Sequence, residues 1–315
     1  MFNIKPSLDA RLPKLIDSDN VVKLQGLRKQ NLAYAFIWIF YYAWVIVFAT
    51  WWTASPLTEV VFGTELRSLL HSVNLISSAI FIFIMKKEWF VHTARIGAML
   101  IIAGMVVFLT VQNPYSQLVS AILIGVTLGC VNASILMPFV FALNNTEKLY
   151  AVVGSNMVIN LLSLFLEGYK AKSFQDNRDL LLSLVILIIA LGATLFFKKS
   201  SVTDNWDDSC QTQEIHPRIY LTLLINCIFA MLCKGAGKGI LNITAINSDF
   251  PVLTWYFIGG LIGCFLYLTI YAFSKKSIHL AWNITFACLA MGLFFNSFTG
   301  KMGFFAVVFA ILLGI

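Results

Sequence analysis

Charged residues are scarce in this sequence. They make up 12% of its 315 residues, whereas hydrophobic residues make up 59%. Soluble domains usually carry about twice that charged fraction, and a single soluble core stops growing near ~250–300 residues. A soluble fold could not hide so much apolar surface. The composition therefore excludes an ordinary soluble domain and indicates a protein that lies in a lipid bilayer.

Acidic residues are absent from the middle of the apolar runs. All fifteen aspartates and glutamates lie in the N-terminal tail, in loops or at the ends of runs, and Glu167 comes closest to a membrane interior. Proton-coupled carriers often bury a carboxylate near mid-membrane. Proton coupling would therefore need His71, or a residue beyond the end of the sequence.

Motifs for catalysis, cofactors and metals are also lacking. The sequence has no phosphate-binding loop, GxSxG, HExxH or dinucleotide fingerprint, so we expect no enzyme activity and no cofactor. Its cysteines form no CxxC pair and mostly lie in apolar runs, which argues against a metal site or disulfides; they are Cys130, Cys210, Cys227, Cys233, Cys264 and Cys288. The formal charge of +7 is spread over the tail and short loops, so no nucleic-acid partner is expected.

Apolar runs of membrane length fill most of the chain. They fall at about 32–53, 68–85, 96–112, 118–143, 150–167, 180–197, 219–241, 251–273 and 280–297, and a tenth begins at 302. Each complete run has the ~17–25 residues that a helix needs to cross a bilayer. Barrel strands would instead alternate polar and apolar residues. The sequence predicts an all-α, polytopic bundle of about ten transmembrane helices.

One long polar segment divides this bundle. We expect a cytoplasmic tail at 1–31, a six-helix half at 32–197, a cytoplasmic central loop at 198–218 and an incomplete second half at 219–315. With the N-terminus inside, most of the 22 lysines and arginines fall on the cytoplasmic side, as the positive-inside rule requires. The sequence stops inside an apolar run, so we expect at least two further helices beyond it.

This layout resembles the major facilitator superfamily, whose twelve helices form two six-helix halves around a central path. The loop between the second and third helices, MKKEWFVHTARIG (85–97), keeps the basic residues Lys86, Lys87 and Arg95 of the family signature but has no Gly-x-x-x-Asp. The resemblance implies a facilitator-like fold in a bacterial-type inner membrane. It also implies secondary transport of a small solute by alternating access.

A second resemblance gives an alternative function. Some bacterial helix-turn-helix regulators carry a facilitator-like membrane region ahead of a DNA-binding domain, and the aromatic first helix YAFIWIFYYAWVIVF is similar to theirs. That resemblance implies a membrane sensor that binds a small-molecule signal and controls a DNA-binding domain C-terminal to residue 315. The full-length gene would distinguish the two.

Polar and aromatic residues near mid-membrane are the candidate solute contacts. Trp38, Tyr41 and Tyr42 share one face of the first helix by i, i+3 and i+4 spacing. Their hydroxyl and indole groups need partners in hydrocarbon. The family resemblance places the first, fourth and seventh helices along the central path, which adds Asn132 and Asn226 as candidates. Aromatic core packing remains an equal alternative for the first-helix residues.

Two further sets have competing interpretations. His71 and Asn74 share a face of the second helix and could form a titrating gate, although a polar pair that bonds a neighbouring helix is the more common arrangement. Lys234 could attract an anionic solute near the outer surface, or could extend its ammonium group to the interface. Asn156 and Asn160 on the fifth helix are expected to point inward and bond other helices.

Small residues spaced four apart occur in three spans. Gly125 and Gly129, Gly235 and Gly239, and Gly259 and Gly263 each have the small-xxx-small spacing. Such pairs let helix backbones approach closely. We expect close helix contacts at all three places, and nothing about the solute follows from them.

Overall fold

The computed structural model describes residues 27–49, 66–86, 88–111, 113–168, 177–198, 217–246, 250–273, 277–298 and 304–315. Within these ranges the chain is all-helical and contains no strand. The α-helices are α2 (Leu32–Trp44), α4 (Leu66–Ile84), α5 (Phe90–Thr110), α6 (Pro114–Phe141), α7 (Asn145–Gly168), α8 (Asn177–Gly192), α10 (Pro217–Ile246), α11 (Val252–Phe273), α12 (Ser277–Asn296) and α13 (Phe304–Gly314). The all-α class is thus confirmed.

Five described segments are long and apolar enough to cross a membrane. They are Lys29–Val47, Phe90–Thr110, Pro114–Phe141, Thr146–Phe165 and Val252–Ala272. Shorter apolar helices occur at Ser68–Ile84, Ser183–Phe196, Asn283–Asn296 and Phe304–Gly314. These helices have the character of a membrane protein, while the count of ten crossings and the cytoplasmic N-terminus stay predictions.

Some helices begin earlier than the apolar runs indicate. Helix α5 starts at Phe90 rather than near 96, so Arg95, expected in a loop, lies in its second turn. Helix α6 starts at Pro114, where the missing N–H is harmless because the first turn of a helix leaves its donors unbonded. The Asn113 side chain caps that turn by accepting from the Tyr115 N–H at 3.0 Å. Because polar residues occupy the first turns of these helices, the hydropathy of the sequence does not reveal where the helices begin.

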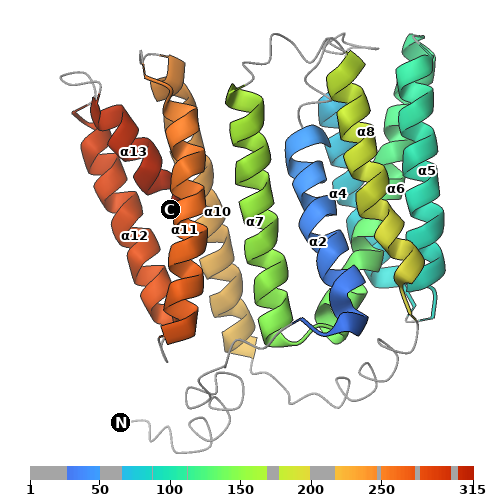
Figure 1. The fold of residues 1–315 in the computed structure, drawn as a ribbon, viewed down its shortest axis with the longest axis horizontal. Coiled ribbons are helices and arrows are strands. Elements are labelled where there is room, and N and C mark those ends of the chain that lie inside the picture. Colours follow the sequence, from blue (N-terminus) through green and yellow to red (C-terminus); the bar gives the residue numbers. More distant parts are fainter. Residues whose placement is uncertain are drawn as a thin grey trace, which may run out of the picture. The chain divides into compact units, whose positions relative to one another are not determined.

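The described chain forms two compact units, residues 27–227 and residues 228–315, and each is considered by itself. The first holds six helices, α2 and α4 to α8 (Figure 1). Helix α6 packs closely against α4 and α5, and α2 packs against α7, α8 and α6. The largest fully buried side chains of this unit are Trp44, Tyr34, Tyr41, Phe90 and Ile37.

The contact between α4 and α6 is made by glycines. A Cβ on Gly125 would lie 2.9 Å from the Val73 side chain, and one on Gly129 would overlap the backbone of Ser77 and Ser78. The two helix backbones can therefore touch only because these α6 positions carry no side chain. The expected close approach at this glycine pair is confirmed.

In the second unit, α13 packs against α11 and α12. A Cβ on Gly259 or Gly263 of α11 would overlap or crowd the α13 backbone at Ile311 and Ile315, so this expected close approach is also confirmed. The third pair is different. A Cβ on Gly235 or Gly239 of α10 would meet no atom of the described residues within 4 Å, so the expected close packing is not found within the described part of this unit.

The glycine contact between α4 and α6 gives a stability prediction. Gly129→Ala should lower the free energy of unfolding by about 1–3 kcal/mol, because α4 must move to admit the methyl group. Gly192→Ala on α8 is the matched control, since a Cβ there meets nothing within 4 Å and alanine has the higher helix propensity. Thermal unfolding of the purified protein in detergent measures both. Equal midpoints for the two variants would contradict the packing described.

Candidate functional site

An aromatic surface lies on α2 and α6. The Trp38 indole stacks on the Phe139 ring of α6 with centroids 3.7 Å apart and planes at 16°. On its own helix Trp38 contacts Tyr42 at 4.5 Å. All three side chains are half-buried. We call Trp38, Tyr42 and Phe139 the aromatic platform.

The platform carries polar groups with unused bonding capacity. Among the described residues, no group hydrogen-bonds the Tyr42 hydroxyl or the Trp38 indole N–H. Tyrosine and tryptophan that are largely removed from water normally satisfy these groups. The two groups are therefore available to a molecule that binds against the rings.

Beside the platform, three helices share a network of uncharged polar side chains. The Tyr41 hydroxyl of α2 donates to Asn132 Oδ1 of α6 at 3.0 Å. Asn132 Nδ2 in turn donates to Asn74 Oδ1 at 3.1 Å and to Ser78 Oγ at 3.2 Å, both on α4. We call Tyr41, Asn132, Asn74 and Ser78 the polar network. It contains no ionised group and links α2, α4 and α6.

Neighbouring tyrosines on α2 differ in their surroundings. Tyr41 is completely buried, with its hydroxyl held by Asn132, whereas Tyr42 is half-buried and belongs to the platform. The Tyr41 hydroxyl therefore has its hydrogen bond within the bundle, and a solute contact at this residue stays a prediction. Just beyond Trp44 the helix widens into a π-helical segment, Val45–Ala49, a feature often found near functional sites. The buried Trp44 Nε1 donates to Ser183 Oγ of α8 at 2.9 Å, which fixes the helix there.

The start of α2 is fixed by a buried carboxylate that sequence reasoning missed. Glu147, in the first turn of α7, is fully buried and accepts from Arg28 Nε at 3.0 Å and from Arg28 Nη2 at 2.9 Å. The Arg28 backbone N–H and Asn31 Nδ2 also donate to this carboxylate, at 3.0 and 2.8 Å. Hydrogen bonding to Glu147 raises the pKa of Arg28 above its usual value.

A sequence signal for this arrangement exists. Asn144 and Glu147 have the N-cap and N3 spacing of a capping box. In the structure Asn144 Oδ1 accepts from the Glu147 N–H at 2.8 Å, and the Asn144 N–H donates to Glu147 Oε2 at 2.9 Å. Because residues 144–149 were expected to form a loop between two apolar runs, this capping box was not identified from the sequence.

The Arg95 side chain on α5 binds the backbone that follows α8. Its guanidinium donates to the carbonyl oxygens of Thr194 at 3.2 Å, Leu195 at 2.9 Å and Phe197 at 3.3 Å. These carbonyls follow α8, where a helix end leaves backbone oxygens without partners. The last basic residue of the 85–97 segment thus caps a helix C-terminus.

The remaining predicted residues have mixed outcomes. His71 is half-buried on α4, one turn before Asn74. The side chains of Asn226, Lys234 and Glu167 lie outside the described part of the structure.

The prediction that Asn156 and Asn160 bond other helices is wrong. Each donates to a carbonyl four residues earlier on α7, at 2.9 and 2.8 Å, because an asparagine amide can reach the preceding turn of its own helix.

Comparisons with protein-family models, curated proteins and solved structures found no match. The facilitator resemblance is therefore untested by relatives. In the described residues no group of three or more His, Cys, Asp or Glu side chains is placed to hold a metal ion. What the site can do must be argued from the platform and the polar network.

The two tyrosines allow a matched stability test. Tyr41→Phe should lower the free energy of unfolding by about 1 kcal/mol, because Asn132 loses its donor inside the bundle. Tyr42→Phe should leave stability unchanged, because its hydroxyl bonds no described group. Denaturant unfolding in mixed micelles measures both. The same loss for both variants would show that the assignment of the Asn132 partner is wrong.

The Glu147 site gives a second test. Glu147→Gln should destabilise the six-helix unit by about 1–3 kcal/mol, because the hydrogen bonds that Arg28 donates lose their charged acceptor, while the Arg28 side chain, 46% exposed, stays partly hydrated. Glu88→Gln is the control, since Glu88 is exposed. Thermal unfolding would measure the difference. If neither Arg28→Gln nor Glu147→Gln lowered the unfolding midpoint, the Arg28–Glu147 pair would not hold α2 to α7.

Proposed function

We propose that the chain is an integral membrane protein that binds a small uncharged solute at the aromatic platform and transports it by alternating access. The observation that carries this is the Tyr42 hydroxyl and Trp38 indole N–H, which have no partner among the described residues and lie beside a network that holds Tyr41 in place. A polar group enclosed in hydrocarbon without a hydrogen bond is costly, and a solute bound against the rings would supply the missing partner.

The solute class follows from the chemistry of these groups. The platform offers ring faces and two hydrogen-bonding groups, and the polar network adds only amides and hydroxyls. Neither set contains an ionised side chain to neutralise a charged solute, and burying an unpaired charge would be expensive. A neutral molecule with a flat or ring-shaped apolar surface and a few hydroxyl or amide groups suits this surface.

The layout of six helices, a long polar segment and further helices is common to both facilitator-like resemblances, and we propose transport first with sensing as the alternative. A sensor would use the same platform, so binding alone does not separate the two functions. Proteoliposomes do. A transporter equilibrates the solute across the vesicle membrane, whereas a sensor binds it and leaves the vesicle interior empty.

The platform predicts how variants respond to a solute found by thermal-shift screening of uncharged compounds. Tyr42→Phe should weaken binding by about twofold to tenfold, the cost of one hydrogen bond. Trp38→Ala should weaken it further, because the ring surface is lost too. Asn156→Ala is the matched control, because that amide bonds only the Val152 carbonyl of its own helix and is exposed on the six-helix unit.

Binding is measured by titration with the purified protein, and transport by uptake into proteoliposomes. Unchanged affinity in both platform variants, with normal unfolding midpoints, would place the solute elsewhere. Loss of binding equal to that of Asn156→Ala would also contradict the proposal.

A further inference from the structure

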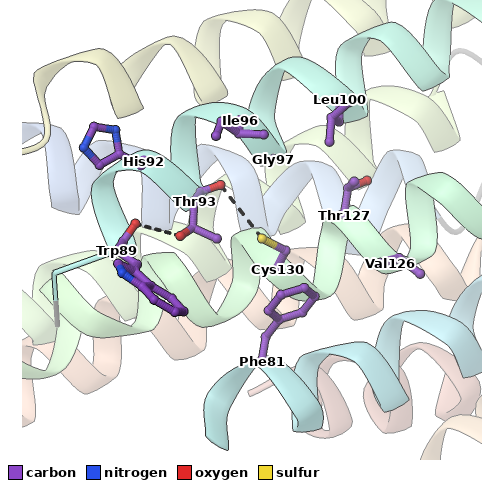
Figure 2. Close-up of a pocket in the computed structure, with 10 residues that line it drawn as sticks. All are labelled: Phe81, Trp89, His92, Thr93, Ile96, Gly97, Leu100, Val126, Thr127 and Cys130. Atoms are coloured by element: carbon purple, nitrogen blue, oxygen red, sulfur yellow. Dashed lines mark hydrogen bonds between the residues drawn. The ribbon is translucent and has the colours of Figure 1, made fainter. Parts of the chain in front are cut away.

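A groove outside the platform runs between α5 and α6. It has a volume of about 300 Å³ and is walled by Ile96, Gly97 and Leu100 of α5, by Val126 and Thr127 of α6, and by Phe81 of α4. Figure 2 shows these side chains around the groove, with Trp89 and His92 at one end of it. Ile96, Leu100 and Val126 are exposed, so the groove opens on the outer, apolar surface of this unit.

The hydroxyls and the thiol along the groove are already used. The Thr93 hydroxyl donates to the Trp89 carbonyl at 2.6 Å, and the Cys130 thiol contacts the Thr93 carbonyl at 3.9 Å (Figure 2). The Thr127 hydroxyl donates to the Leu123 carbonyl at 2.7 Å. With these hydroxyls bonded to backbone carbonyls, the surface of the groove is mostly carbon. It is effectively apolar and suits an alkyl chain rather than a polar solute.

One end of the groove carries positive charge. The Lys86 ammonium lies 4.8 Å from the centre of the Trp89 ring, and both side chains are exposed. His92 is exposed beside them. In the segment 85–97 three lysines and arginines outnumber one acid, Glu88. Tryptophan with lysine at the end of an apolar helix is typical of the membrane–water interface.

A second groove provides an internal comparison. It follows the same helix pair toward the other end of α5 and α6, has a volume of about 410 Å³, and includes Val107, Tyr115 and Val119. No charged residue contributes to it. Neither groove has a lysine or arginine in its wall, and the first differs in ending at Trp89, whose ring carries the Lys86 ammonium.

We infer that the groove at Trp89 binds one anionic phospholipid, with an acyl chain between α5 and α6 and the phosphate at Lys86. This inference rests on the membrane location given above and not on the solute platform. The charge of the Lys86 end selects an anionic headgroup over a zwitterionic one, because basic residues at the interface attract anionic lipids. The acyl chain gains from the apolar walls in either case.

Native mass spectrometry of the delipidated protein, titrated with phosphatidylglycerol or phosphatidylcholine, tests the inference. The first phosphatidylglycerol should bind at least about fivefold more tightly than phosphatidylcholine, as expected for one lysine. Lys86→Glu should remove this preference. Val126→Trp should fill the groove and weaken binding of the first lipid of either kind.

Matched controls locate the effect. Lys29→Glu removes an exposed charge before α2, and Val119→Trp fills the second groove; both should keep the phosphatidylglycerol preference. No preference in the natural protein would overturn the inference, as would a preference that survives Lys86→Glu and Val126→Trp. Solute binding should be unchanged in Val126→Trp, so failure of the lipid site and failure of the platform are distinguishable.

Discussion

The backbone contact between α4 and α6 at Gly129 is the constraint on which the site depends. Because Gly129 has no side chain, Ser77 and Ser78 of α4 lie against the α6 backbone, and Ser77 Oγ donates to the Gly125 carbonyl at 3.1 Å. That approach brings Ser78 and Asn74 within reach of Asn132, one turn further along α6. A larger residue at Gly129 would separate α4 from α6 and open the polar network.

The polar network and the aromatic platform have different roles, although they include the adjacent residues Tyr41 and Tyr42. Hydrogen bonds between membrane helices contribute only about 0.6 kcal/mol on average, so the network stabilises the bundle modestly. Its larger effect is geometric: it fixes Tyr41, and this sets the position of the next residue along the helix, Tyr42, in the platform. The Trp44–Ser183 hydrogen bond and the Arg28–Glu147 pair fix the two ends of the same helix.

Sequence reasoning found the helices because hydropathy reports burial in lipid directly, and it selected Tyr41, Asn74 and Asn132 because polar side chains in apolar runs need partners. It could not separate Tyr41 from Tyr42, since both fit one helical face and only the position of Asn132 distinguishes them. Glu147 was missed because its partner Arg28 lies 119 residues earlier. The four-residue spacing of Asn156 and Asn160 does not show whether each amide bonds its own helix or a neighbouring one.

The central claim is that Tyr41 and Asn132 are bonded across α2 and α6. A double-mutant cycle with Tyr41→Phe, Asn132→Leu and the double variant measures this most directly, by denaturant unfolding in mixed micelles. The account predicts a coupling energy near about 0.6 kcal/mol and no more than about 1.7 kcal/mol, the mean and the maximum for hydrogen bonds between membrane helices. Additive effects, within about 0.3 kcal/mol, would contradict it.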